Sequence, residues 1–570
     1  MEHQDKTRRT CTTTCAGCSE SAFWQLTSRD VTGPVDIMIS RRPVIPIVFL
    51  PGIMGSNIFN TELKKPTWEP DKGFSTLQMY NTQIYASRRQ QLLNKENTEV
   101  YTDGTIKVPD EEREESLKRR GWGSVMAKTY HPFLGHLQRW LNNVFHNGVL
   151  SLTWKEVMGL PLAKYGMHYN AAPLRMDELE TLPKYRFEAW ACGYNWLRSN
   201  EESAQKVQEF ITQTVLPHYA EDEEKGKARL GTDKKVLLIT HSMGGLVARS
   251  MVAQGFDTNI LGVIHIAMPA NGAAEAYSNM RQGVQGFPLN TVLGSNARTL
   301  GAVYSQCLGG LELLPFGQSY NSPLAARTET PAWLKKPSQQ GEWFFLYDVR
   351  NTPALGSVKD GTDIYDKVYT SPHWYGLLPD HNLRYFDPAS ILANSSSLEE
   401  NRNLFTTYIQ NVKEFHRTIR RIYHQCTYAI WGESYNEPAI GEIVWVRSKN
   451  KEKRQNIFDD GVGKCGTIDG EYTLNTIHHI GDGTVPHASW QGDLHCIRGY
   501  SRLGVSDGTA SHVSSGELHC ENKPNSCKSE HTAPKGFSHQ DACLSNETQK
   551  AALYFTVKII SDNKDKLKSL

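Results

Sequence analysis

Residues 236–249 read Val-Leu-Leu-Ile-Thr-His-Ser-Met-Gly-Gly-Leu-Val-Ala-Arg, and this stretch decides the fold. Its apolar start runs directly into a turn that carries Ser242, as a parallel strand covered on both faces would. Gly244 and Gly245 follow, and they remove side-chain bulk where a helix and a strand pass closely. A buried strand, a sharp serine turn and a small-residue helix are together typical of a nucleophile elbow.

The elbow motif G-x-S-x-G is incomplete, because Thr240 stands at its first glycine position. An ordinary strand-to-helix turn with an incidental serine is the alternative interpretation. A catalytic interpretation therefore requires the rest of the chain to supply a base, an acid and an oxyanion hole.

Composition permits a large core and argues against one class of partner. The chain has 570 residues, of which 39% are hydrophobic, enough for about two to four domains or one heavily decorated domain. Its formal net charge is only +1, which argues against a general electrostatic grip on nucleic acid. The 13 tryptophans suit a large apolar groove.

The sequence shows neither a membrane span nor a Sec signal peptide, and its cysteines are those of a protein made in the cytoplasm. No apolar run reaches the roughly 18 residues of a membrane span, and the polar segment Met1–Thr10 is followed by no apolar stretch of a Sec signal peptide. The eleven cysteines match no standard zinc spacing and are expected to be reduced thiols. A C-terminal disulfide formed after export is the alternative. Cysteines crowd both ends of the chain, at Cys11, Cys15, Cys18, Cys496, Cys520, Cys527 and Cys543.

Strands that alternate with helices predict an α/β fold with a mostly parallel central sheet and helices on both faces. We expect an irregular leader over residues 1–42 and a first core part over 43–272, which includes a polar insertion at 58–120. Residues 273–425 predict a cap or lid insertion that ends in a long helix. Residues 426–570 complete the core and carry the acid and the base.

An apolar run at Val44–Leu50 ends in the glycine-flanked segment Pro51–Asn57. A strand that stops in such a loop can aim backbone N–H groups into a cleft. In α/β-hydrolases a loop of this kind donates one oxyanion-hole N–H, and the residue after the nucleophile, here Met243, donates the other. A plain strand-ending turn is the alternative.

Asp482 lies between two glycines, Gly481 and Gly483, on a turn after a late strand. A hydrolase triad places its acid at such a turn, where the carboxylate orients the histidine. A simple tight turn is the alternative. The preceding residues 433–475 predict a loop-rich excursion, with His478 and His479 at a strand end or behind the site.

The chain order Ser, Asp, His requires a base after Asp482. His539 is the preferred candidate because it stands on a loop just before a final helix, Asn546–Ile560. His512 is the second candidate. His519 and His531 lie beside cysteines, but their spacing gives little support for a metal site. Two further histidines follow Asp482, His487 and His495.

Four segments together resemble the lipase branch of the α/β-hydrolases that includes lecithin–cholesterol acyltransferase and GPI-inositol deacylase. They are 43–57, Gly193–Trp196, the serine elbow and Gly481–Pro486, and the His539 loop continues the match. The overall plan, with large insertions and no signal peptide, is most similar to bacterial lipase effectors of the type VI secretion system.

This resemblance implies a nucleophile at Ser242, an acid at Asp482, a base at His539 and oxyanion donors at the N–H groups of Met54 and Met243. The sequence departs from the family at Thr240 and at Asn195, where an aspartate is frequent. A charged catalytic role is therefore not expected for Asn195.

The predicted function is a serine-dependent lipase or phospholipase that hydrolyses acyl esters of membrane phospholipids through an acyl-enzyme. The resemblance implies export by type VI secretion, action as an antibacterial toxin in the periplasm or membrane of a target cell, and a cognate immunity protein. The alternatives are a non-catalytic hydrolase-like binding protein, and an acyltransferase or plain esterase of the same fold. No cofactor is expected; calcium among the acidic loops stays open, because no ligand spacing demands it.

Overall fold

The structure is a computed structural model of the 570-residue chain. It describes residues 42–72, 85–109, 112–146, 148–168, 170–224, 229–284, 294–316, 364–392, 397–447, 458–467, 470–490, 493–504 and 536–567, together with short strands at 9–10, 13–16, 19–22, 37–38 and 344–347. The predicted base candidates His512, His519 and His531 lie outside the described residues.

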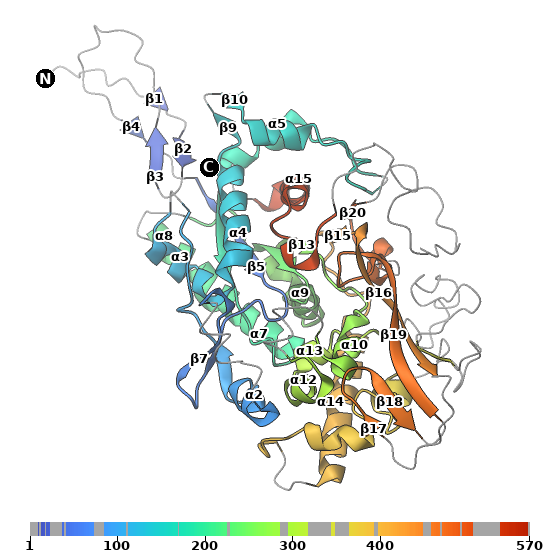
Figure 1. The fold of residues 1–570 in the computed structure, drawn as a ribbon. Coiled ribbons are helices and arrows are strands. Elements are labelled where there is room, and N and C mark those ends of the chain that lie inside the picture. The colour runs from blue at the N-terminus through green and yellow to red at the C-terminus, as the bar shows by residue number, and fades with distance from the viewer. Residues whose placement is uncertain are drawn as a thin grey trace, which may run out of the picture.

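A six-stranded, wholly parallel sheet forms the centre of the molecule (Figure 1). Near-continuous apolar runs build its strands, as expected for a sheet buried on both faces. In spatial order the strands are β11 (Arg186–Ala191), β5 (Val44–Leu50), β12 (Val236–His241), β13 (Ile260–Ile266), β15 (Thr427–Gly432) and β20 (Gly499–Leu503). The predicted α/β-hydrolase fold, with its mostly parallel sheet, is confirmed.

Alternating residues of β5 and β12 divide the core between the two faces of this sheet. One face packs against α7 (Asn200–Phe210), α9 (Gly244–Ala253) and α14 (Leu398–Ile419). The other face packs against α4 (Ala127–Asn142), α5 (Leu152–Met158), α6 (Met176–Leu179) and α15 (Asn546–Asp562). Because helices cover both faces, chemistry is left to the loops at the carboxyl ends of the strands.

The second sheet corrects one expectation from the sequence. Residues 433–475 are not mainly loop: β16 (Ser434–Arg447) pairs antiparallel with β19 (Gly470–Gly481) along nearly its whole length. The two strands belong to a five-stranded sheet with β14 (Phe344–Tyr347), β17 (Phe458–Asp459) and β18 (Lys464–Thr467). The long ribbon leaves the central sheet after β15 and returns at Gly481, so it delivers the Asp482 turn to the sheet edge.

Smaller elements decorate the first part of the core. The insertion at 58–120 contains a three-stranded sheet of β6 (Ile58–Asn60), β7 (Lys65–Trp68) and β8 (Thr98–Val100), with helices α2 (Ala86–Leu92) and α3 (Glu114–Arg119). The short N-terminal strands β1 (Arg9–Thr10), β2 (Thr13–Ala16), β3 (Ser19–Ala22) and β4 (Ile37–Met38) lie at one end of the molecule (Figure 1). Among the described helices, none combines the length and the apolar character of a membrane span.

The region predicted as a lid contributes helices beside the second sheet (Figure 1). They are α10 (Glu275–Gln282), α12 (Ala297–Tyr304), α13 (Leu308–Leu311), two short turns of helix at Tyr365–Tyr369 and Asp380–Tyr385, and α14. Ser397 caps the N-terminus of α14, because its side chain accepts a hydrogen bond from the Glu400 N–H. The predicted domain boundaries themselves stay a prediction.

Candidate active site

Ser242 occupies a strained turn between β12 and α9. Its φ of 51° lies in the left-handed region that residues with a side chain rarely adopt. Gly244 allows this turn to sit against the first loop, since a Cβ there would lie 2.6 Å from the Pro51 carbonyl oxygen and 2.7 Å from that of Leu50. The elbow predicted from the sequence therefore forms, with Ser242 at its tip.

His539 bridges the serine and the aspartate, as the chain order predicts. Its Nε2 lies 2.8 Å from Ser242 Oγ, and its Nδ1 lies 2.9 Å from Asp482 Oδ2. The three residues are 4%, 1% and 6% exposed for Ser242, Asp482 and His539, so their hydrogen bonds are shielded from water. This is the geometry of a Ser-His-Asp triad.

Asp482 is fixed by its own turn. One carboxylate oxygen, Oδ1, accepts the N–H groups of Thr484 at 3.1 Å and Val485 at 2.8 Å. Gly483 takes a φ of 90°, which a glycine adopts without strain. The other oxygen is thereby left facing His539.

The environment of His539 favours its protonated form. Burial by itself would lower the pKa of His539, but the charge and hydrogen bond of Asp482, and then the charge of Glu275, outweigh burial and raise it. The His539 N–H also donates to the Asp482 carbonyl oxygen at 2.6 Å. Acid and base are consequently joined through both side chain and main chain.

The loop after β5 lies directly against the serine. A Cβ on Gly52 would be 2.9 Å from Ser242 Cβ and 3.4 Å from its Oγ. Met54 has a φ of 60°, and its carbonyl oxygen accepts a hydrogen bond from Trp68 Nε1 at 2.7 Å. Met243 is the N-cap residue of α9, where the first N–H groups of a helix lack intrahelical acceptors. Met243 thus directly follows the nucleophile, and Met54 belongs to the loop whose Gly52 lies against Ser242. Their role as oxyanion donors stays a prediction.

Two departures from the family pattern have structural explanations. Thr240 is fully buried, and its Oγ1 lies 2.8 Å from Nδ1 of His265 on the neighbouring strand β13. The Asn195 amide donates to the carbonyl oxygen of Thr98 at 2.9 Å and to its hydroxyl at 3.1 Å. Asn195 therefore anchors the β8 strand, in agreement with the expectation that it carries no catalytic charge.

Sequence reasoning missed three residues next to the triad. His241 and Tyr130 form buried hydrogen bonds behind the serine. Glu275, in the first turn of α10, interacts electrostatically with both His539 and Asp482. Of these three, only His241 could have been found from the sequence, because it is adjacent to Ser242. Tyr130 and Glu275 are distant in sequence and lie near the site only in the folded chain.

Among the residues that the structure describes, the other histidines near Asp482 do not join the triad. His478 and His479 lie within β19, which confirms their assignment to a strand. His487 has Nδ1 3.6 Å from a Glu433 oxygen. His495 lies in a short helical turn, Leu494–Cys496.

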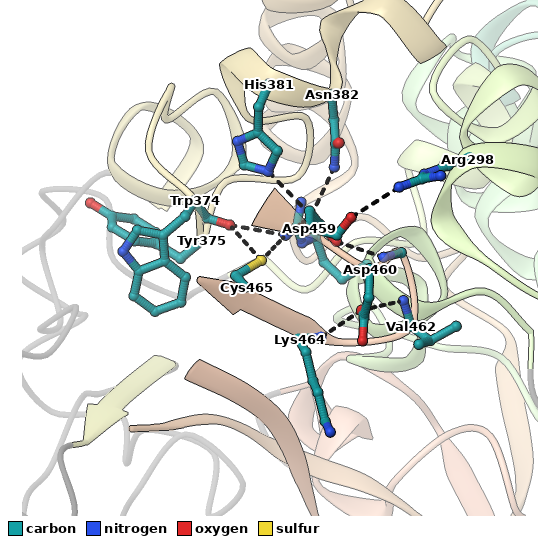
Figure 2. A network of polar contacts seen from close by, with 12 residues as sticks. Arg298, Trp374, Tyr375, His381, Asn382, Asp459, Asp460, Val462, Lys464 and Cys465 are labelled. Atoms are coloured by element: carbon teal, nitrogen blue, oxygen red, sulfur yellow. Dashed lines mark hydrogen bonds and ion pairs between the residues drawn. The ribbon is translucent and has the colours of Figure 1, made fainter. Parts of the chain in front are cut away.

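A cluster between the lid helices and the second sheet has the donor types of a metal site but contains a protein cation. Ligand atoms of His381, Asp459 and Cys465 all lie within 4.8 Å of one another, and Figure 2 shows His381 and Cys465 directed at Asp459. Arg281 Nη2 lies 2.8 Å from Asp459 Oδ2 and 3.3 Å from Cys465 Sγ. Since a metal would need ligands at about 2.0–2.3 Å, the guanidinium occupies its place.

The cysteines described in the structure are free: Cys192, Cys307, Cys426, Cys465, Cys496 and Cys543. Burial raises the pKa of each of these thiols. No disulfide joins any two of these six cysteines, and the expectation of reduced thiols stays a prediction. The side chains of Cys11, Cys15, Cys18, Cys520 and Cys527 are not described.

The sheet, the elbow and the hydrogen-bonded triad define an α/β-hydrolase. Among solved structures, the chain is similar to one described as the crystal structure of the Tle4–Tli4 complex, with 28% sequence identity and a TM-score of 0.74. The similarity covers 91% of this chain and 99% of the other. No protein-family model matches the sequence, and no curated protein matches it significantly.

Tle4 is a type VI secretion phospholipase effector with the α/β-hydrolase fold. The resemblance to lipase effectors of this secretion system, predicted from the motifs, is confirmed by this similarity over most of the chain.

Proposed function

We propose that the protein is a carboxylic ester hydrolase that cleaves an acyl ester of membrane phospholipids with Ser242 as nucleophile. The observation that carries this proposal is the continuous hydrogen-bonded series from Ser242 through His539 to Asp482, at 2.8 and 2.9 Å. Nucleophile, base and orienting acid stand in the geometry that acyl transfer requires.

The reaction proceeds through two displacements at the ester carbonyl. His539 Nε2 takes the Ser242 proton while Oγ bonds to the carbonyl carbon, and the oxyanion is stabilised by the N–H groups of Met54 and Met243. The bond to the leaving alcohol then breaks, and His539 returns its proton to that alcohol. Water, deprotonated by His539, attacks the acyl carbon of the acyl-enzyme. The bond between that carbon and Ser242 Oγ then breaks, His539 returns the proton to Oγ, and the fatty acid leaves.

Access to the serine requires a change in the covering elements. Ser242 is only 4% exposed, which supports a model in which covering elements move before a long acyl chain reaches Oγ. The helices α10 to α14 are the candidates for the part that moves. We therefore expect higher turnover on phospholipid vesicles than on soluble short-chain esters, whereas equal rates would favour a plain esterase.

The similarity to Tle4 extends the proposal to the biological setting. By analogy with a complex of Tle4 and Tli4, we propose that a cognate immunity protein binds this chain and blocks its activity. Export by type VI secretion and action on membranes from the target periplasm belong to the same analogy. Toxicity when the protein is directed to the periplasm, and its absence in the cytosol, tests that setting.

The decisive experiment replaces the nucleophile. Ser242→Ala is expected to abolish fatty-acid release from phosphatidylethanolamine and phosphatidylglycerol vesicles while thermal melts stay unchanged. Ser250→Ala is the matched control, since Ser250 is a buried serine two turns further along α9. Activity retained by folded Ser242→Ala would remove the basis of the proposal.

Two measurements separate the competing functions. A fluorophosphonate probe labels an activated serine, so absence of labelling at Ser242 in the parent protein would favour a non-catalytic binding protein. Product analysis with an added alcohol acceptor separates hydrolysis from acyl transfer, because an acyltransferase would yield a new ester in place of free fatty acid.

A further inference from the structure

His241, the residue before the nucleophile, connects the two loops that flank the serine. Its Nε2 lies 3.0 Å from the carbonyl oxygen of His539, and its Nδ1 lies 3.1 Å from the hydroxyl of Tyr130. The Gly52 N–H donates to that same hydroxyl at 3.2 Å. His241 and Tyr130 are both only 3% exposed, so water does not compete for these bonds.

The chemistry of the partners fixes the direction of each hydrogen bond. A carbonyl oxygen only accepts, so Nε2 of His241 carries the hydrogen that it donates to His539. In the neutral ring Nδ1 is then the acceptor, and the Tyr130 hydroxyl donates to it. Burial, followed by the nearby His539 ring, lowers the pKa of His241 to about 3, so the ring is neutral throughout the physiological range.

The result is one directed series: Gly52 N–H to Tyr130 oxygen, Tyr130 O–H to His241 Nδ1, and His241 Nε2–H to the His539 carbonyl. It begins in the loop that carries the predicted oxyanion donor Met54 and ends on the main chain of the base. The main chain at His539 has a second anchor, because the backbone N–H of His539 donates to the Asp482 carbonyl oxygen at 2.6 Å.

We propose that His241 is a positioning residue that, with Tyr130, sets the placement of the oxyanion loop relative to the catalytic base. His241 touches neither the ester nor the transferred proton. It acts through its hydrogen bonds, by way of Tyr130 to Gly52 and directly to the His539 carbonyl. These bonds keep the oxyanion loop and the base at a fixed relative position while Ser242 attacks. This inference rests on the proposed function, since positioning matters only if Ser242 and His539 perform acyl transfer.

The two segments that this series joins are far apart in the sequence, so local structure cannot hold them in register. A displacement of about 1 Å in a catalytic group can cost roughly a hundredfold in rate. Loss of the connection should therefore lower turnover more than it lowers stability. A residue with a purely structural role would show the reverse pattern.

Tyr130→Phe and His241→Gln test the proposal. The first removes one oxygen atom without changing the packed ring, and the second keeps a side-chain N–H donor but loses the imidazole geometry. Tyr428→Phe is the matched control, because its hydroxyl also makes a partly buried hydrogen bond, to Asp562 at 3.2 Å. Tyr428 stands near the start of β15, at the amino ends of the parallel strands, whereas the triad lies at their carboxyl ends.

Turnover and KM on vesicles, and the rate of fluorophosphonate labelling, are measured on protein shown to be folded by near-UV circular dichroism and thermal melts. We expect kcat and the labelling rate of Tyr130→Phe to fall together about tenfold to a hundredfold, with KM unchanged and Tyr428→Phe equal to the parent. The double variant should be no slower than the slower single variant, because both interrupt one series.

Folded Tyr130→Phe with kcat and labelling rate within about twofold of the parent would overturn the positioning role. If His241→Gln does not fold, the isosteric Tyr130→Phe decides alone. Failure of the proposed function looks different: the parent protein would then not be labelled at Ser242, or Ser242→Ala would stay active.

Discussion

Thr240 and His265 share a hydrogen bond of 2.8 Å between adjacent central strands, directly beneath the nucleophile turn. Thr240 therefore replaces the glycine of the elbow motif with a polar contact that the neighbouring strand satisfies. Burial, and then the charge of Arg249, lower the pKa of His265 to about 3, so the pair is neutral and carries no catalytic charge.

Thr240→Val should destabilise the protein without impairing the chemistry. The change keeps the branched shape but leaves Nδ1 of His265 without this partner, which typically costs about 1–3 kcal/mol of unfolding free energy. Urea titration measures the loss, and activity per folded molecule should stay near the parent value. Thr240→Ser keeps the hydroxyl and serves as the control. An unchanged urea midpoint for Thr240→Val would contradict the importance of this bond.

Asp482→Asn should abolish most activity through the wrong histidine tautomer. Two backbone N–H groups hold the Oδ1 position, so the asparagine oxygen takes that place and its NH₂ group faces Nδ1 of His539. Nδ1 must then accept, Nε2 carries the hydrogen, and it cannot remove the Ser242 proton. We expect kcat to fall about 10⁴-fold.

Vesicle hydrolysis together with a thermal melt checks this expectation for Asp482. Asp541→Asn provides a control, because Asp541 lies only two residues after His539 but its carboxylate bonds the Ser538 hydroxyl. A loss of tenfold or less in folded Asp482→Asn would indicate that another group orients the base.

Ser242 and Asp482 could be predicted from the sequence because each lies in a short local motif, and His539 because the fold fixes the chain order and places the base before the last helix. The polar surroundings could not. Tyr130 comes from the first turn of α4, where the apolar residues that follow predict only a buried helix face. Glu275 follows a glycine- and alanine-rich loop without any motif. Their proximity to His539 depends on how separate helices pack, which residue spacing does not encode.

The long ribbon of β16 and β19 was missed for a related reason. Residues 439–446 are strand-like, but a charged stretch at 447–454 and glycines follow them, and these favour a loop. The ribbon is defined by antiparallel pairing between Ser434–Arg447 and Gly470–Gly481, and such long-range pairing is invisible to local pattern. The sequence therefore predicted where the acid lies but not the support that holds it.

Gly52→Ala should block catalysis while the fold stays intact. The added methyl group would lie 2.9 Å from Ser242 Cβ, 3.1 Å from His241 Nδ1 and 3.4 Å from Ser242 Oγ. It must push the loop away from the nucleophile or tilt the serine, and a shift of about 1 Å is enough for a hundredfold loss in kcat.

Gly301→Ala is the matched control for Gly52, because an added Cβ there meets nothing within 4 Å. Gly301 lies inside α12, so its replacement should leave activity unchanged and raise stability by about 0.5–1 kcal/mol. Steady-state kinetics measures kcat of both variants, and urea titration measures their free energy of unfolding. Parent-like kcat for Gly52→Ala would show that the loop does not bear on the serine.

Arg281→Met should weaken the lid region strongly. Arg281 and Asp459 are almost completely buried and lie 2.8 Å apart, and removal of one partner of such a pair costs about 3–5 kcal/mol. The double variant Arg281→Met/Asp459→Asn should lose less stability than Arg281→Met alone, because it no longer buries an unpaired Asp459 carboxylate. Thermal melts of Arg281→Met, Asp459→Asn and the double variant measure this coupling; additive losses would contradict it.

Glu275 should set the acidic side of the pH–rate profile. Burial raises the pKa of Glu275 to about 7; the charge of His539 opposes this shift, and the charge of Asp482 adds to it. The Glu275 carboxylate in turn raises the pKa of His539. Because His539 acts as a base only when neutral, kcat/KM should rise with pH through this raised pKa. Glu275→Gln removes the charge, lowers the pKa of His539 and should move the acidic limb to lower pH, whereas Glu414→Gln on the exposed face of α14 should not. If the acidic limb of kcat/KM lies at the same pH in Glu275→Gln as in the parent, Asp482 alone raises the pKa of His539.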